Sequence, residues 1–211
     1  MMNKQGTDAW LMERCGKVTA SRIADLMAKT KSGWGATRAN YAAQLIAERL
    51  TGTVAPSFTN AAMQHGTETE PEARRAYEFF IDRDVQQVGF VNHQGIEMAG
   101  ASPDGLVGDD GLVEIKCPNT ATHIETLLGG NVPDKYVKQM QFQMICTQRS
   151  WCDFASYDNR LPERMRLFVK RVEWDSDLAR EINTAVAEFI REIDDTVGKL
   201  LAKYEPQLEA A

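Results

Sequence analysis

The sequence predicts an α/β fold in which a central mixed β-sheet is flanked by helices and a long helix ends the chain. Short apolar or alternating segments bounded by turn residues are typical of strands, and longer segments with apolar residues three or four positions apart are typical of helices. Both kinds occur along the 211 residues, without repeats, low-complexity segments or an obvious linker. We therefore expect a single domain over residues 1–211.

Three helical segments are predicted first. Residues 19–29 and 36–50 have helical spacing, and Gly52 should end the second segment because glycine readily adopts a left-handed conformation after a helix. Residues 60–80 continue this pattern, with a possible break at Gly66 or Pro71. The segment 32–35 between the first two helices fits either a mobile loop that contacts a ligand or a plain connection.

Strands and helices then alternate along the middle of the chain. The strands have apolar or alternating patterns between turn residues, which is typical of a sheet with covered faces. The predicted strands are 85–92, 95–101, 112–116, 150–157 and 166–172, and the predicted helices among them are 120–128 and 133–146.

The C-terminal segment has the clearest helical pattern of the chain. Its apolar residues recur every three or four positions and form one stripe, which is expected to pack on the body of the domain. The same stripe could instead form a subunit contact. Its members are Leu178, Ile182, Val186, Phe189, Ile193, Val197 and Leu200.

Two carboxylates and a lysine lie close to two turn signals in the middle of the sequence. Asp104 lies in the turn segment 102–105, a second turn segment covers 109–111, and Glu114 follows it. If the chain doubles back at the second turn, Asp104 and Glu114 become neighbours across a hairpin. Because residues i and i+2 of a strand share one face, Lys116 is expected beside Glu114.

These residue types fit a metal-dependent hydrolase. Magnesium prefers oxygen ligands, keeps several waters and is usually held by one or two carboxylates plus a substrate phosphate. Asp104 and Glu114 would supply the carboxylates and the Ile115 carbonyl a neutral oxygen, while Lys116 could orient the attacking water or stabilise charge in the transition state. Each part alone is also typical of an ordinary turn or of a strand with one solvated face, so the interpretation depends on their combination.

Several further motifs occur in one order along the chain. Pro103-Asp104, followed after nine residues by Glu114-Ile115-Lys116, matches the PD-(D/E)XK pattern. With the other motifs, the chain resembles the phage lambda exonuclease-like (YqaJ-like viral recombinase) family of that nuclease superfamily. The other motifs are Val18-Thr19-Ala20-Ser21 after Arg14, the segment from Gly66 to Arg74, Cys117-Pro118, Leu128-Gly129-Gly130 and Gln139-Met140-Gln141.

The resemblance implies a restriction-endonuclease-like core and a role for each matching residue. Asp104, Glu114 and the Ile115 carbonyl would bind two Mg²⁺ ions, for which Mn²⁺ could substitute. Lys116 would assist the water. Glu70 and Gln139 would complete the catalytic pocket, although Pro71, which departs from the family pattern, leaves the position of Glu70 open. The residues implied for the 5′-phosphate of a DNA end are Arg14, Ser21 and Ser102.

The resemblance also implies an activity and partners. Similar proteins are 5′→3′ exonucleases that degrade one strand of linear duplex DNA to 5′-mononucleotides and leave a 3′ overhang. They work as ring-shaped homotrimers and serve phage recombination with a single-strand annealing protein. Two alternatives stay open: a structure-specific or restriction-type endonuclease with the same chemistry, and a non-catalytic module that binds DNA ends.

The charge balance limits this interpretation without excluding it. A net charge of −6 disfavours nonspecific duplex binding, which depends on lysine and arginine. Basic residues cluster at 14–22, 29–38, 135–138 and 160–171, whereas acids concentrate in the C-terminal segment, so we expect a basic inner surface and an acidic outer face. Ordinary solvated faces are the alternative. No apolar run could span a membrane, and no signal-peptide core follows Met1 and Met2, so a cytoplasmic protein is expected.

The cysteines and histidines do not form a recognisable metal motif. No CxxC pair is present, so free thiols are expected. Some nucleases of the superfamily hold an iron–sulfur cluster with one early and three late cysteines, but only two late cysteines occur here. The three histidines are far apart in sequence, which disfavours zinc. These residues are Cys15, Cys117, Cys146, Cys152, His65, His93 and His123.

Overall fold

The computed structural model describes residues 3–31, 33–56 and 60–204. Its central five-stranded sheet has the order β10-β9-β8-β7-β4. β8 and β9 pair in parallel and the other neighbours are antiparallel, so the sheet is mixed, as predicted. The strands are β4 (Val85–Gln86), β7 (Gly105–Val107), β8 (Gly111–Lys116), β9 (Trp151–Tyr157) and β10 (Leu167–Glu173).

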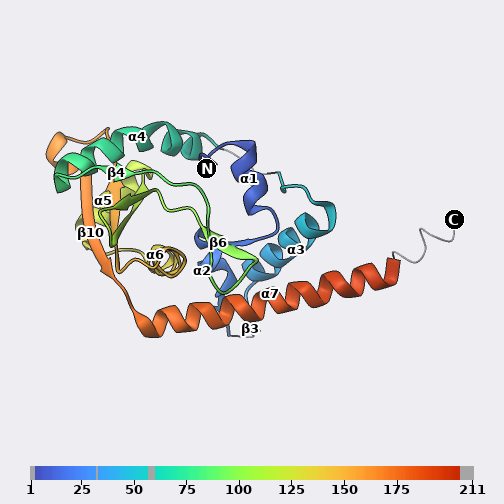
Figure 1. Ribbon diagram of the computed structural model, residues 1–211. Helices are drawn as coiled ribbons and strands as arrows, with labels where there is room; N and C mark the ends of the chain where they lie inside the picture. Colours follow the sequence, from blue (N-terminus) through green and yellow to red (C-terminus); the bar gives the residue numbers. More distant parts are fainter. Residues whose placement is uncertain (1–2, 32, 57–59, 205–211) are drawn as a thin grey trace.

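Helices cover both faces of this sheet (Figure 1). On one face, Ala73 and Tyr77 of α4 (Ala61–Ile81) pack with Val113 and Ile115 of β8. On the other face, α6 (Asp134–Thr147) packs Met140 and Met144 against strand residues that include Leu112. The alternation of side chains along β8 thus directs Val113 and Ile115 into one core and Leu112 and Glu114 toward α6.

A second sheet joins the N-terminal part of the chain to the region before the carboxylates. β1 (Val18–Thr19) pairs in parallel with β6 (Ala99–Ala101), and β6 pairs antiparallel with β5 (Val91–Asn92). The remaining elements are α1 (Asp8–Arg14), η1 (Ala20–Arg22), α2 (Ile23–Leu26), the hairpin of β2 (Lys29–Thr30) and β3 (Gly33–Trp34), α3 (Ala36–Thr51), α5 (Thr120–Gly129) and η2 (Glu163–Met165).

The predicted C-terminal helix is α7 (Ser176–Tyr204). Its buried residues include Ile182, Val186 and Phe189, which pack in one core with residues of α2, α3 and α6. The prediction that the stripe packs on the body is confirmed. Figure 1 shows that the C-terminal turns of α7 extend past the rest of the chain, and Tyr204 is exposed there.

The helix predicted over 19–29 is confirmed only at 20–26 and is wrong at both ends. Val18 and Thr19 are extended and pair with Ala99 and Gly100, and only the short η1 and α2 follow. The Thr19 N–H donates to the Tyr41 hydroxyl at 3.0 Å, so a side chain of α3 binds this extended backbone. Parallel pairing between distant segments cannot be recognised from local spacing.

Other boundaries also differ from the predictions. The predicted strand 85–92 is divided between β4 and β5, which belong to different sheets, and 95–101 is extended only at 99–101. α4 continues without a break through Pro71. This residue lies on the exposed side of the helix, where water can bind the carbonyl that proline leaves without a donor. The structure adds α1 and β7, which we did not predict.

The prediction for the start of the chain partly depends on Met1 and Met2, and that for segment 32–35 on Ser32. These three residues lie outside the described residues. The rest of that segment belongs to the β2–β3 hairpin and the start of α3. No described helix has both the length and the hydropathy that a membrane span needs.

Candidate active site

The β7–β8 hairpin brings the two predicted carboxylates together. Gly105 and Val113 are paired in this hairpin. Asp104 directly precedes Gly105 and Glu114 directly follows Val113, so the two carboxylates lie at the same end of the hairpin on neighbouring strands. The Ile115 N–H donates to Oδ2 of Asp104 at 2.7 Å. Asp104 is thereby fixed against the strand that carries Glu114, as the turn signals predicted.

Glu114 is buried, with 1% of its surface exposed, and its two carboxylate oxygens accept hydrogen bonds. Gln139 Nε2 donates to Oε1 at 2.6 Å and Gln143 Nε2 donates to Oε2 at 2.5 Å. Lys116 forms an ion pair with Oε1. These partners offset part of the cost of removing an ionised carboxylate from water.

The charges of the site perturb one another. Burial raises the pKa of Asp104 well above its usual range, and the negative charges of Glu114 and Glu70 raise it further. Burial alone would lower the pKa of Lys116, but the carboxylates of Glu114 and Asp104 outweigh burial and raise it. The ammonium therefore stays charged while the carboxylates repel each other, and a cation bound between them would relieve that repulsion.

Glu70 reaches the same site from α4. Its Oε1 accepts from Arg74 Nη2 at 2.6 Å, and the same nitrogen donates to the backbone oxygen of Asp104 at 3.4 Å. Arg74 therefore joins the helix to the turn that carries Asp104. The unbroken α4 resolves the question that Pro71 raised about the position of Glu70.

Two of the three residues predicted for a DNA end, Arg14 and Ser102, contact Trp10. Trp10 Nε1 donates to Ser102 Oγ at 2.9 Å, and the Arg14 guanidinium lies 3.9 Å from the centre of the Trp10 ring. Ser21 is exposed in η1 after β1, and Ser102 follows β6, which runs parallel to β1. The two serines therefore follow neighbouring strands in the same direction, and Ser102 lies two positions before Asp104.

The site has the oxygen donors that a hard divalent ion requires. Within residues 3–31, 33–56 and 60–204, no three His, Cys, Asp or Glu side chains form a cluster that could hold a metal. A cation held by Asp104 and Glu114 would therefore need backbone oxygen, water and substrate phosphate, which is the usual pattern for magnesium. In the described part of the chain no hydrogen bond reaches Oδ1 of Asp104, which leaves this oxygen available.

Three partners of the site were not predicted, and all lie one helical turn from a predicted residue. Gln143 follows Gln139 by four positions, Arg74 follows Glu70 by four, and Trp10 precedes Arg14 by four. Residues at this spacing lie on the same face of a helix. The signal was therefore present in the sequence, but it required the correct helices, and α1 was not among those predicted.

The four cysteines are free thiols, as predicted. Cys117 directly follows Lys116, and burial, with the charges of Glu70 and Asp104, raises the pKa of its thiol to about 12. Its thiol is therefore protonated at neutral pH and a poor nucleophile or metal ligand.

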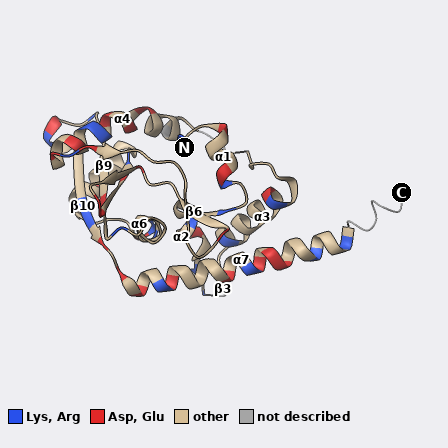
Figure 2. Ribbon diagram, in the orientation of Figure 1, with Lys and Arg blue, Asp and Glu red and all other residues tan. Residues whose placement is uncertain are grey.

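The predicted separation of acidic and basic faces is wrong around α7. Arg38 is buried and pairs with Glu192, and Arg49 pairs with Asp194, so acids of the C-terminal helix neutralise arginines of α3. Figure 2 shows acidic and basic residues interspersed along α7.

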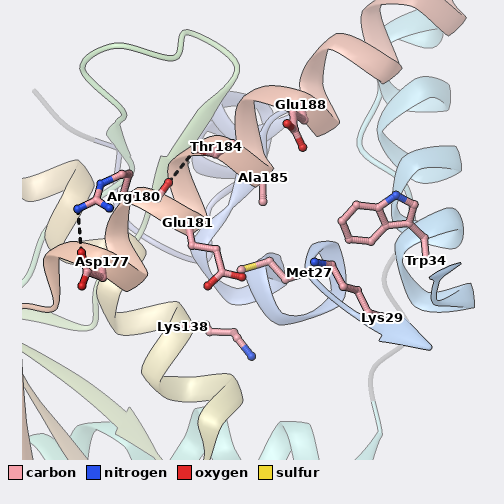
Figure 3. A pocket seen from close by; sticks show the side chains of 10 residues that line it. All are labelled: Met27, Lys29, Trp34, Lys138, Asp177, Arg180, Glu181, Thr184, Ala185 and Glu188. Carbon is pink, nitrogen blue, oxygen red and sulfur yellow. Dashed lines mark hydrogen bonds and ion pairs between the residues drawn. The ribbon is translucent and has the colours of Figure 1, made fainter. Parts of the chain in front are cut away.

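A groove of about 430 Å³ beside α7 has the same mixed character (Figure 3). Lys29 and Lys138 line it together with Glu181 and Glu188, and none of the predicted site residues does. The lining residues are Met27, Lys29, Trp34, Lys138, Asp177, Arg180, Glu181, Thr184, Ala185 and Glu188. The groove is thus not the uniformly basic surface expected for DNA.

Comparisons with known proteins agree with this fold and site. A family model for the YqaJ-like viral recombinase domain matches residues 9–150, well over half of the chain. The chain belongs to the YqaJ-like viral recombinase family, which confirms the resemblance seen in the motifs.

Individual relatives include solved structures. The chain is 52% identical to an alkaline exonuclease (LHK-Exo) from Laribacter hongkongensis, covering 95% of this chain and 100% of that one with a TM-score of 0.89. The same enzyme in complex with dAMP matches with a TM-score of 0.90. A phage-related exonuclease from Haemophilus somnus 129PT is 16% identical, with a TM-score of 0.68 over 87% of this chain and 96% of that chain, and so shares the fold.

A curated viral relative is much longer than this chain. The uncharacterized protein R354 of Acanthamoeba polyphaga mimivirus is 24% identical over 164 residues. The match covers 72% of this chain but only 28% of R354.

Proposed function

We propose that this protein is a magnesium-dependent 5′→3′ exonuclease that degrades one strand of linear duplex DNA. The observation that carries the proposal is the close pair of the partly buried Asp104 and the buried Glu114, with Lys116, at the β7–β8 hairpin. Family membership and the 52% identity to an alkaline exonuclease support DNA as the substrate. Fold alone does not define function, so the proposal of nuclease chemistry depends on the residues of this site.

Each side chain would have a separate role. Asp104, Glu114 and the Ile115 carbonyl would hold two Mg²⁺ ions, which, when bound, would polarise the scissile phosphate and lower the pKa of the attacking water. Lys116 would orient that water and stabilise the additional negative charge on phosphorus. Gln139 would hold Glu114 in place, and Glu70 would add negative charge near Asp104.

The products follow from the bonds that change. Water attacks phosphorus, the bond from phosphorus to the 3′-oxygen breaks, and that oxygen leaves with a proton. The released product is a 5′-mononucleotide, and the shortened strand again carries a 5′-phosphate. Arg14, Ser21 and Ser102 would bind this phosphate before each cleavage, with the guanidinium suited to two parallel hydrogen bonds. The structure of the related enzyme with dAMP, a mononucleotide, agrees with such a product.

Larger assemblies are proposed from the family resemblance. A homotrimeric ring would keep duplex DNA within reach of the site, and a single-strand annealing protein would receive the 3′ overhang. Both belong to a recombination pathway of a phage or prophage in the bacterial cytoplasm.

The decisive experiment compares linear and closed circular duplex DNA, with magnesium and with EDTA. We expect magnesium-dependent release of mononucleotides from linear DNA only, and at least a 10²-fold loss with Lys116→Ala while DNA binding persists. Lys138→Ala is a matched control, since this lysine pairs with Asp134 at the surface groove. Cleavage of closed circles would favour the endonuclease alternative, and binding without any cleavage would favour the end-binding module.

A further inference from the structure

Glu48 of α3 is a buried carboxylate that lies outside the catalytic pair. Only 4% of its surface is exposed. Its Oε2 accepts from the Gly16 N–H at 2.7 Å, and its Oε1 accepts from Gln44 Nε2 at 2.9 Å and from the Ala55 N–H at 3.2 Å. Charged side chains are rarely buried unless they are paired, and here the partners are neutral hydrogen-bond donors.

These bonds hold the turn that follows α1. Gly16 has a φ of +71°, which favours glycine, and a Cβ there would lie 2.8 Å from Cγ of Arg49. Arg49 Nε also donates to the Gly16 carbonyl oxygen at 2.9 Å. Glu48 thus binds the N–H of Gly16, and Arg49, the next residue of α3, binds its C=O. These two bonds hold the end of α1 in one position.

Arg14 lies in the last turn of α1, two residues before this glycine. Burial lowers the pKa of its guanidinium, and the nearby Tyr41 and, to a smaller extent, the negative charge of Glu48 oppose that effect. In the described part of the chain, the Arg14 side chain forms no ion pair or hydrogen bond, and its guanidinium lies over the Trp10 ring. Its N–H donors are therefore available to an anion. Glu48 holds the Gly16 turn by a hydrogen bond, and its negative charge partly balances the positive charge of Arg14.

We propose that Glu48 is a positioning residue for recognition of the DNA 5′-phosphate: its carboxylate fixes the Gly16 turn and thereby directs Arg14 toward the phosphate beside Ser102. This inference rests on the proposed function, because it assigns Glu48 to the anion site of that function. Glu48 itself does not contact the DNA. Its effect depends on both the negative charge and the hydrogen bond to Gly16.

The test measures binding of 5′-phosphorylated and 5′-hydroxyl duplexes in EDTA by fluorescence anisotropy, so that cleavage does not contribute. We expect the unaltered protein to prefer the phosphorylated end and Glu48→Ala to reduce that preference by about tenfold, which is comparable to the loss of one hydrogen bond to a charged group. Glu48→Gln, which keeps an acceptor for Gly16 but lacks the charge, should give an intermediate value. The ratio of two affinities in one sample is unaffected by a fraction of unfolded protein.

A matched control is Glu192→Gln, which removes another acid that contacts α3 but pairs with Arg38 instead of the Gly16 turn. It should keep the full preference. If Arg14→Ala abolishes the preference and both Glu48 variants retain it, the inference is wrong and the proposed anion site stands. If the unaltered protein has no preference for a 5′-phosphate, the proposed anion site itself is wrong, and the inference with it.

Discussion

At the residue scale, the three side chains that donate to Glu114 differ in their exposure to solvent, and therefore in whether they can leave Glu114 for another partner. Lys116 is partly exposed and can turn toward a substrate. Gln143 is fully buried, so water cannot replace Glu114 as the partner of its amide. Its amide is thus committed to Glu114 Oε2. This difference separates a side chain available for chemistry from one that maintains the geometry of a ligand.

Replacing Gln143 should therefore affect both stability and metal binding. In Gln143→Leu the buried Oε2 loses its donor, which costs about 1–3 kcal/mol of unfolding free energy. Metal affinity should fall by about 10–100-fold, because outer partners orient a metal ligand. Urea unfolding and calorimetric titration with Mn²⁺ measure the two effects. Gln64→Ala, at an exposed position of α4, should change neither, and a Gln143→Leu variant with unaltered Mn²⁺ affinity would contradict this role.

Asp104 should make stability depend on pH in the absence of metal. A carboxyl with a raised pKa in the folded state stabilises the fold fully below its unfolded pKa of about 3.9, and this contribution is lost as pH rises through the folded pKa. Asp104→Asn keeps an acceptor for the Ile115 N–H but cannot ionise. The free energy of unfolding of this variant should exceed that of the unaltered protein by an amount that grows with pH and reaches about 0.5–2 kcal/mol. Such a gain is typical when an unfavourable charge is removed from a functional site.

Urea unfolding in EDTA at a series of pH values measures this difference. Asp84→Asn, at an exposed position, serves as the control and should give a difference that does not vary with pH. A constant difference for Asp104→Asn would show that Asp104 does not carry an unfavourable charge in the fold. The same variant should have no nuclease activity, since it lacks a metal ligand.

At the element scale, the sequence predicted the strand and helix that carry Glu114 and Gln139 but not β7, the strand that follows Asp104. β8 was recognisable because its alternating pattern and turn signal are local, and Gln139 was placed on a correct helix. β7 has only three residues, Gly105–Val107, and depends on pairing with β4 and β8. Such short strands have little pattern of their own, so their existence follows from tertiary contacts.

Gly105 provides a test of how closely β7 must approach its neighbour. A Cβ at this position would lie 2.0 Å from Cγ1 of Val85, so Gly105→Ala must push β7 away from β4. We expect a loss of about 1–3 kcal/mol, which is typical of overpacking, and reduced activity because Asp104 directly precedes this strand. Gly198→Ala, with open space around it in α7, should instead stabilise the protein by up to about 1 kcal/mol.

Thermal unfolding and initial rates on linear duplex DNA measure both variants. If Gly105→Ala were as active and as stable as the unaltered protein, the close contact between β7 and β4 would not determine the position of Asp104. The comparison with Gly198→Ala separates this contact from the general effect of replacing glycine.

At the scale of the whole molecule, charge placement was the part that the sequence could not predict. Arg38 and Glu192 are 154 positions apart, and their pairing requires that α3 and α7 lie side by side. Clusters of like charge along the sequence therefore did not become surfaces of like charge. The carboxylate pair was predictable because one hairpin joins both members, whereas ion pairs between distant helices depend on how the layers pack.

The site should also couple metal binding to the stability of the whole fold. A ligand that binds only the folded state stabilises it by about 2.7 kcal/mol at a concentration 100 times its Kd. Asp104 and Glu114 meet only in the folded hairpin, between the layers of α4 and α6. Saturating Mg²⁺ or Mn²⁺ should therefore raise the Tm relative to EDTA, and Asp104→Asn should reduce the increase. Scanning calorimetry at matched ionic strength measures this shift, with K⁺ as the control for screening. An equal increase in the variant would mean that the ions bind elsewhere, whereas no increase in the unaltered protein would contradict a metal site formed by these carboxylates.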